Sequence, residues 1–450
     1  MSTLSINEAG RSSVSAERAE SSPVTGYIDN EDHGLAHQGI DTSSGFRMPI
    51  RILGAFFVFF NGTYICFWVL PKLLCAGVHS IFYLIQHIMG RLFDLGYYRT
   101  LLITGSCLAT CGTISLSFSR EYVAIILSQG VCTGLGFGLL YVPTISFINK
   151  CFPQKRALAL GIATSGAPAG GIVYTTIFNQ LITKIQFAWT VRVLGLVMCL
   201  LFLAASAILL PTSPRRKHSR STEKMKVIDL RALKDIPFWS YTLANFFLYL
   251  GYITPYFYIP TYAQTRLHTT SVFASNILII TQVSSIIGRV ATTIIAHHFG
   301  SMMPWIFCGT LSGVLCLCWT TADTSLRFIA FSAFYGEFIL LKLVIYLLLN
   351  RPGGVSGALI PLPQSVFPHI CPNQAVLGTW LGMAQSMGSF ASLLGPPVAG
   401  LLGSLQGHNN SKISFTNIQD FSGSVMIFGA IQLVGLWYLL CKKRNKPRIF

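Results

Sequence analysis

Two glycine-rich apolar runs, at residues 127–149 and 157–181, constrain the fold of this chain more than any other feature. Each is long enough to cross about 30 Å of hydrocarbon at ~1.5 Å per residue, and neither contains a charge. In a bilayer such glycines let two helix backbones approach closely, because packing drives helix association there. Lys150, Lys155 and Arg156 lie in the short connection, which should therefore face the cytoplasm. We predict a membrane helical hairpin with tight interhelical contacts.

The composition of the whole chain supports a membrane protein. Of its 450 residues, 52% are hydrophobic and 10% are charged, whereas soluble domains carry about 25% charged residues. Lys and Arg exceed Asp and Glu by 17. These cations cluster in short segments between apolar runs, which is the positive-inside pattern rather than that of a nucleic-acid-binding protein. We expect contact with membrane lipid and no nucleic-acid partner.

The residues of catalytic and metal sites show no organised pattern. The 12 cysteines form no disulfide framework, and those at 107, 111, 316 and 318 lie in apolar runs, where cysteine packs as a small hydrophobe. Gly134, Gly136 and Gly138 match a nucleotide-binding fingerprint only in their spacing, because no strand precedes them. The sequence therefore predicts no enzyme activity, no cofactor and no metal site.

Twelve apolar runs in two sets of six organise the chain. We predict a disordered cytoplasmic tail at 1–50, a first bundle at 51–211, a basic cytoplasmic linker at 212–236, a second bundle at 237–441 and a basic cytoplasmic tail at 442–450. An even number of crossings places both tails and the linker on the same side. Asn409, in an Asn-Asn-Ser sequon, then lies outside, where it can be glycosylated.

The segment Gly90-Arg91-Leu92-Phe93-Asp94, followed by Arg99, resembles the loop motif between helices 2 and 3 of the major facilitator superfamily. The resemblance implies an all-α membrane fold of two pseudo-symmetric six-helix bundles with about 12 transmembrane helices. It also implies that Gly90 permits close helix approach, while Asp94 caps a helix and pairs with basic residues to latch the inward gate. A weaker second copy, from Gly288-Arg289 to Gly300, lacks the acid.

Two further segments resemble the monocarboxylate-porter branch of that superfamily. They are Arg156–Ala163 with the glycines that follow it, and Gly54-Ala55-Phe56 with Phe59-Phe60-Asn61, which is similar to fungal members. The likeness covers most of residues 50–440. Animal members carry an Asp four residues before an Arg on helix 8, for proton and substrate binding. This chain has Ser285 and Arg289 at that spacing, so the arginine carries over and the acid does not.

Arg289 is the first candidate for substrate binding. A lone arginine in a membrane span costs at least about 2.5 kcal/mol on insertion scales, so it normally faces a cavity or has a partner. One interpretation is an anchor for a carboxylate, which a guanidinium binds through two parallel hydrogen bonds. The other is a residue of the cytoplasmic gate near the end of helix 8, as the partial loop motif suggests. The sequence leaves both open.

Other polar residues in the predicted spans are weaker candidates. Asn61 on helix 1 and Asn245, Tyr249 and Tyr252 on helix 7 can line a path for an amphipathic molecule, because a proline interrupts helix 7 and frees carbonyl groups. For the tyrosines nearer the outer end, an aromatic belt at the membrane interface is the alternative. Two histidines, His79 and His87, titrate near neutral pH and are considered for a proton relay. Snorkelling to the outer interface explains Arg192.

Residues 337–355 look inserted into helix 10. Their deletion joins Phe334-Tyr335-Gly336 to Ser356-Gly357-Ala358 and restores a family-like helix. Gly336-Glu337-Phe338 can be encoded by GGTGAGTTT, which contains a typical intron 5′ boundary. We therefore consider a retained intron or a gene-model error, with a true membrane-dipping segment as the alternative. The connection between the first two spans, around 70–80, is also shorter than in the family.

These observations predict a secondary transporter of the plasma membrane that moves an organic anion or amphipathic small metabolite by alternating access. Efflux of a secondary metabolite and proton-linked uptake of a monocarboxylate both remain open. The missing helix 8 acid and the aromatic helix 7 favour the bulkier cargo. A membrane sensor without transport, or the product of a defective gene, is the alternative of another class.

Overall fold

The computed structural model describes residues 47–62, 85–213, 229–336, 359–404 and 414–444. The N-terminal half contains α2 (Arg47–Gly62), α5 (Gln86–Asp94), α6 (Tyr98–Leu116), α7 (Tyr122–Ile125), η1 (Ile126–Thr133), α8 (Gly134–Cys151), α9 (Arg156–Thr164) and α10 (Gly166–Thr212). The C-terminal half contains α11 (Leu230–Lys234), α12 (Ile236–Thr265), α13 (Ser271–Phe299), α14 (Met302–Cys318), η2 (Trp319–Thr321), α15 (Ser325–Gly336), α17 (Pro361–Val366), η4 (Phe367–His369), η5 (Gln374–Val376), α18 (Leu377–Ser404) and α19 (Phe415–Arg444). Within these ranges the fold is all-α, as predicted.

The long helix α10 covers two of the predicted membrane spans. Ile185 and Gln186 leave the helical conformation, and Gln186 has a φ of 63°, so the chain reverses direction there. The first arm continues the direction of α9 after a break at Ser165, and the second arm returns. The two arms of α10 therefore act as separate helices beside α2, α6 and α8.

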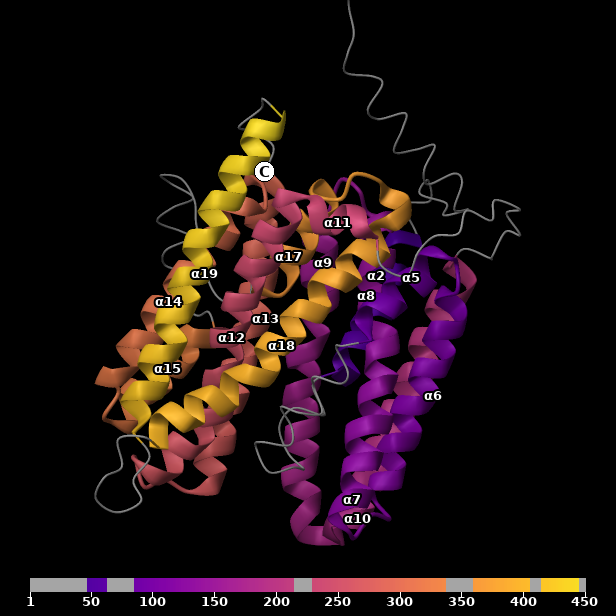
Figure 1. Cartoon of the computed structure of the whole chain (residues 1–450). Helices are drawn as coiled ribbons and strands as arrows, with labels where there is room; N and C mark the ends of the chain where they lie inside the picture. Colours follow the sequence, from indigo (N-terminus) through magenta and orange to yellow (C-terminus); the bar gives the residue numbers. More distant parts are fainter. Residues whose placement is uncertain (1–46, 63–84, 214–228, 337–358, 405–413, 445–450) are drawn as a thin grey trace, which may run out of the picture.

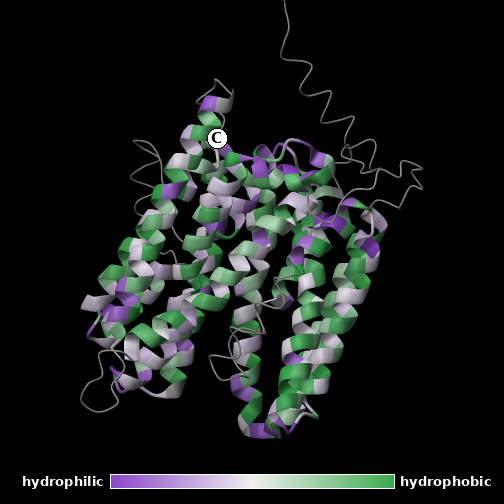
Figure 2. Cartoon of the chain, in the orientation of Figure 1, coloured by the Kyte–Doolittle hydropathy of each residue, from purple (hydrophilic) through white to green (hydrophobic). Residues whose placement is uncertain are grey.

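Length and apolarity mark several of these helices as membrane spans. Among the described residues, five stretches are long and apolar enough to cross a bilayer: 122–151, 156–212, 272–299, 302–321 and 415–442. On the second arm of α10, Leu196, Leu200 and Leu203 are each more than half exposed and share one helical face. Figure 2 shows hydrophobic residues along most of the length of the long helices. Such a surface suits a hydrocarbon environment.

The two halves lie side by side, with the N-terminal half in indigo to magenta and the C-terminal half in orange to yellow (Figure 1). Their ribbons converge at the end that carries α11 and diverge towards the opposite end. At the convergent end α5 packs on α18, α9 packs on α13 and α17, and α8 packs on α18. We call this the closed end. It is the part of the fold that positions the polar residues described below.

The glycines of the predicted hairpin make close contacts, and their partners are helices outside the hairpin. A Cβ atom on Gly136 would lie 2.4 Å from the backbone nitrogen of Ala109 in α6, and one on Gly170 would lie 1.8 Å from the carbonyl oxygen of Phe60 in α2. A Cβ atom on Gly161 would meet Thr293 of α13. Glycine permits a close approach but has no side chain that selects the partner. The sequence therefore marked close contacts without identifying which helices make them.

Several predictions concern residues outside the described ranges. They are the cytoplasmic tails, most of the basic linker, His79, the sequon at Asn409, the inserted segment 337–355 and the short connection near 70–80. They stay predictions.

Candidate functional site

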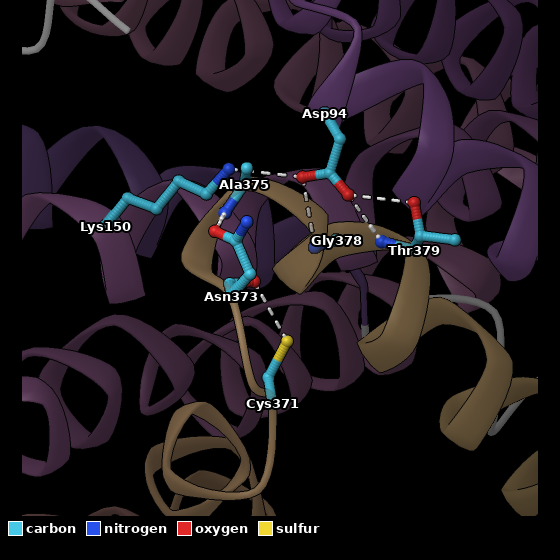
Figure 3. A network of polar contacts seen from close by, with 7 residues as sticks. All are labelled: Asp94, Lys150, Cys371, Asn373, Ala375, Gly378 and Thr379. Atoms are coloured by element: carbon cyan, nitrogen blue, oxygen red, sulfur yellow. Dashed lines mark hydrogen bonds and ion pairs between the residues drawn. The ribbon is translucent and has the colours of Figure 1, made fainter. Parts of the chain in front are cut away.

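The carboxylate of Asp94 forms the centre of a polar network at the closed end (Figure 3). Asp94 ends α5, and its Oδ1 accepts hydrogen bonds from Lys150 Nζ and from the backbone N–H of Gly378, both at 3.1 Å. Its Oδ2 accepts from the backbone N–H of Thr379 at 2.7 Å and from the Thr379 hydroxyl at 2.9 Å. The side chains of Asp94 and Lys150 are almost fully buried. A carboxylate from the N-terminal half thus caps the N-terminus of α18, where the helix dipole favours negative charge.

Glycines bring the two halves close enough for this network. A Cβ atom on Gly90 would lie 1.9 Å from the carbonyl oxygen of Gly378, and one on Gly378 would lie 2.4 Å from the carbonyl oxygen of Gly90. One turn further along α18, a Cβ atom on Gly382 would lie 2.4 Å from the carbonyl oxygen of Gln86. Backbone therefore packs on backbone along α5 and α18, and any side chain at these positions would push the helices apart.

Two more polar contacts join segments at the closed end. Arg99, at the start of α6, donates from Nε to the hydroxyl of Ser213 at 2.9 Å and from Nη2 to its carbonyl oxygen at 2.7 Å. It thereby caps the C-terminal end of α10, where cations are favoured. Asp229 accepts a hydrogen bond at 3.0 Å from the indole N–H of Trp380 in α18. The predicted motif residues Gly90, Asp94 and Arg99 thus all lie in contacts between segments, and Arg91 lies one turn before the end of α5.

The thiol of Cys371 lies beside this network. Its Sγ donates to the carbonyl oxygen of Asn373 at 3.1 Å, in the connection that leads to α18. Burial raises the pKa of the Cys371 thiol to about 12, against a smaller lowering by the hydrogen bond at Asn373. The thiol is therefore protonated and poorly nucleophilic at neutral pH while the closed end stays closed.

Arg289 lies deeper in the protein, ten residues and thus about 15 Å from the end of α13 at ~1.5 Å per residue. Its side chain is buried, and Nη1 donates to the carbonyl oxygen of Thr164 at 2.6 Å. Thr164 is the last residue of α9. The guanidinium therefore bridges the two halves at Ser165, where α9 passes into α10. Its Nε has no hydrogen-bond partner in the described ranges. The guanidinium therefore keeps capacity to bind an anion.

Neutral polar side chains lie at a similar depth. Asn245 of α12 and Gln385 of α18 are buried, and their amide nitrogens have no hydrogen-bond partner within the described segments. Both converge on Gly388, where a Cβ atom would lie 3.3 Å from Asn245 Nδ2 and 3.4 Å from Tyr249 Cδ2. Tyr249 also interacts with Tyr141 of α8 and with the charge of Arg289. A buried amide without a partner costs about 1–3 kcal/mol, so these groups suit water or a polar ligand.

The remaining candidates have partners within the protein. Tyr252 packs between Tyr249 and Tyr256, with ring centroids 6.4 and 5.4 Å apart, and its carbonyl oxygen accepts a hydrogen bond from Tyr335. Asn61 is fully buried, and its amide contacts the hydroxyl of Tyr174 and the carbonyl oxygen of Met198. Asn61 thus joins α2 to both arms of α10, and its role in substrate binding stays a prediction.

Sequence reasoning missed Gln385 and Tyr141. Gln385 is an uncharged amide inside an otherwise apolar run, between Gly382 and Gly388, and that combination was the available signal. Tyr141 carries no comparable signal, because tyrosine is common in membrane helices. Its position opposite Tyr249 depends on how the two halves pack.

The fold and this arrangement define a membrane carrier of two helical bundles joined at one end. The family model of the Major Facilitator Superfamily matches residues 72–352 of the chain. The chain therefore belongs to this superfamily and is a transporter, which confirms the predicted family, fold class and class of function. Its assignment to the monocarboxylate-porter branch stays a prediction.

Similar proteins agree with this assignment. The MFS-type transporter dbaD of Emericella nidulans is 28% identical over 82% of both chains. The aspyridones efflux protein apdF of the same organism is 27% identical over 77% of this chain and 65% of its own length. The crystal structure of the human organic anion transporter MFSD10 (TETRAN) superposes with a TM-score of 0.65, covering 86% of this chain and 99% of that one at 12% identity. This last likeness concerns the fold alone.

Proposed function

We propose that this transporter exports an amphipathic organic anion, of the kind made as a secondary metabolite, by alternating access across the plasma membrane. Arg289 binds the anionic group of the cargo, and Asn245, Gln385 and Tyr249 bind its neutral polar groups. The small-molecule cargo enters from the closed end when the halves separate there.

One observation carries the proposal: the Arg289 guanidinium is buried at mid-depth and forms no ion pair with any carboxylate of the described residues. A charge buried in a membrane protein is costly unless it has a partner or contacts a polar cavity. A carbonyl oxygen satisfies one donor but does not neutralise the charge. A carboxylate or sulfonate on the cargo supplies both hydrogen bonds and charge.

The direction of transport is inferred from charge placement, from a relative and from the aromatic side chains. Lys150 binds Asp94 of α5, Arg156 begins α9, and Arg99 binds Ser213 at the closed end, which under the positive-inside rule is the cytoplasmic end. Export is supported by the name of the relative apdF, an efflux protein for aspyridones. The aromatic row from Tyr249 to Tyr256 suits a cargo with apolar surface.

Exchange in proteoliposomes tests the proposal. Vesicles with the full chain are loaded with unlabelled 1-naphthalenesulfonate, which keeps its charge at all working pH values, and uptake of the labelled compound is followed. Arg289→Gln is the test variant, and Arg266→Gln, at an exposed arginine that ends α12, is the matched control. We expect the control to exchange normally and the Arg289 variant to lose exchange. Equal exchange by both variants would exclude the anchor.

Proton-linked uptake of a monocarboxylate is the second candidate, and Arg289 is the observation that favours it, because a short carboxylate fits the same guanidinium. The same vesicles are tested with labelled lactate and pyruvate, with and without a pH gradient. Rapid uptake that requires the gradient would support this candidate. In our proposal both short acids move slowly in either condition, because they lack apolar surface for the tyrosines.

A further inference from the structure

A cavity at the closed end lies apart from the polar layer around Arg289. Its volume is about 740 Å³, and it is lined by the loop before α9, the end of α13, the start of α14 and the region of η4. Both halves contribute: Arg156 comes from the N-terminal half, and His297, His298 and His369 come from the C-terminal half. The cavity therefore spans the joint that must open and close during transport.

All ionisable side chains that line the cavity are basic. Its titratable and charged groups are Arg156 of α9, His297 and His298 at the end of α13, and His369 of η4, and the described lining contains no carboxylate. Two helix N-termini also face the cavity, at Arg156–Ala157 of α9 and at Met302–Met303 of α14. The partial positive charge of a helix N-terminus adds to that of the side chains. The cavity thus offers only attraction to an anion.

The surroundings place the cavity at the edge of the membrane. Phe299 and Met303 in the lining are about half exposed, and Trp437 of α19 completes one wall. Tryptophan and other apolar side chains beside basic groups are typical of the membrane–water interface, where lipid headgroups lie. A phosphate group from a lipid can reach this position as easily as a phosphate from solution.

We propose that this cavity binds a phosphate group and that the bound phosphate holds the two halves together at the closed end. Arg156 binds the phosphate from the N-terminal half and the histidines bind it from the C-terminal half, so the ligand bridges the joint. The imidazole nitrogens donate hydrogen bonds to phosphate oxygens, and the guanidinium of Arg156 supplies a permanent positive charge. This site goes beyond the proposed cargo site and does not depend on the identity of the cargo.

The test uses the full-length protein in phosphatidylcholine nanodiscs. Two probes distinguish the source of the phosphate: inorganic phosphate in solution, and phosphatidylinositol 4-phosphate in the bilayer. The readouts are the thermal midpoint and the rate at which N-ethylmaleimide modifies Cys371, resolved by peptide mass spectrometry. We expect one probe to raise the midpoint and to slow the modification of Cys371.

Two variants at exposed positions examine the site without disturbing the core. His297→Gln/His298→Gln removes two imidazole side chains from the lining, and Gln154→Glu adds a carboxylate to it. Each should weaken the apparent affinity about tenfold or more. Lys234→Gln, an exposed cation of α11 outside the cavity, is the matched control and should bind like the wild type.

A response to soluble phosphate alone assigns a soluble ligand, and a response to the lipid alone assigns a headgroup. If neither probe acts on the wild type, or if the control loses as much affinity as the histidine variant, the proposal is wrong. Because these readouts need no cargo, they fail independently of the exchange assay.

Discussion

Among the helix contacts that join the two halves in the described part of the chain, the α5–α18 and α9–α13 crossings differ in how their charges are satisfied. Where α5 crosses α18, the Asp94 carboxylate accepts four hydrogen bonds and pairs with Lys150. Where α9 crosses α13, Arg289 reaches a backbone carbonyl, with no carboxylate beside it in the described part of the chain. At the α5–α18 crossing the buried charges are paired, whereas at the α9–α13 crossing the charge of Arg289 has no counter-ion in the described part of the chain. We infer that the first serves mainly to hold the closed state, while the second is available to bind cargo.

We expect the largest effect on the closed state from removing the Asp94–Lys150 ion pair at the α5–α18 crossing. Asp94→Ala leaves Lys150 buried without its counter-ion, which costs about 3–5 kcal/mol. The closed state should lose most of its population, and Cys371 should then react with N-ethylmaleimide many times faster, as measured by peptide mass spectrometry. Adding Lys150→Met should restore part of the protection, because no buried charge remains. If Cys371 in the Asp94→Ala variant reacts as slowly as in the wild type, this crossing does not hold the closed state.

A methyl group at the glycine contact tests the same crossing through packing. Gly90→Ala places a Cβ atom on the carbonyl oxygen of Gly378, and overpacking of this kind costs about 1–3 kcal/mol. We expect faster modification of Cys371 and a lower rate of cargo exchange. Gly435→Ala is the control, since nothing lies within 4 Å of a Cβ atom there. Similar behaviour of both variants would mean that close approach at Gly90 is unimportant.

A substitution at the α9–α13 crossing should change the affinity for cargo. Arg289→Lys keeps a positive charge but loses the planar pair of donors, so the KM for an anionic cargo should rise about tenfold. Protection of Cys371 should stay as in the wild type, because the Asp94 network is intact. The comparison between the two crossings fails if this variant exposes Cys371 as strongly as Asp94→Ala does.

We expect the smallest effect from a substitution among the neutral polar side chains near Arg289. Gln385→Leu removes a buried amide whose nitrogen has no partner in the described ranges, so thermal stability should be unchanged or higher. Cargo affinity should fall by less than about tenfold, the usual scale of one neutral hydrogen bond. Thermal midpoints and exchange rates measured on the same preparation separate the two effects. A large loss of stability would show that the amide is structural.

The loop motif was the most informative part of the sequence. From Gly90, Asp94 and the family resemblance we predicted a capped helix and a basic partner. In the structure the Asp94 carboxylate caps α18 and pairs with Lys150. The identity of that helix was not predictable, because the contact joins positions 285 residues apart. The glycines of 127–181 show the same limit: they marked close packing, yet their partners lie in α2, α6 and α13.

Apolar length, charge placement and glycine content follow from local chemistry, because each span must satisfy its own backbone in lipid. The sequence alone therefore determined the all-α membrane class and the candidates Arg289 and Asp94. Only the tertiary structure decided which groups are left without partners, which residues face each other across the halves and where a cavity lined by histidines forms. These properties depend on how two separate bundles dock, and docking is set by contacts between residues far apart in the chain.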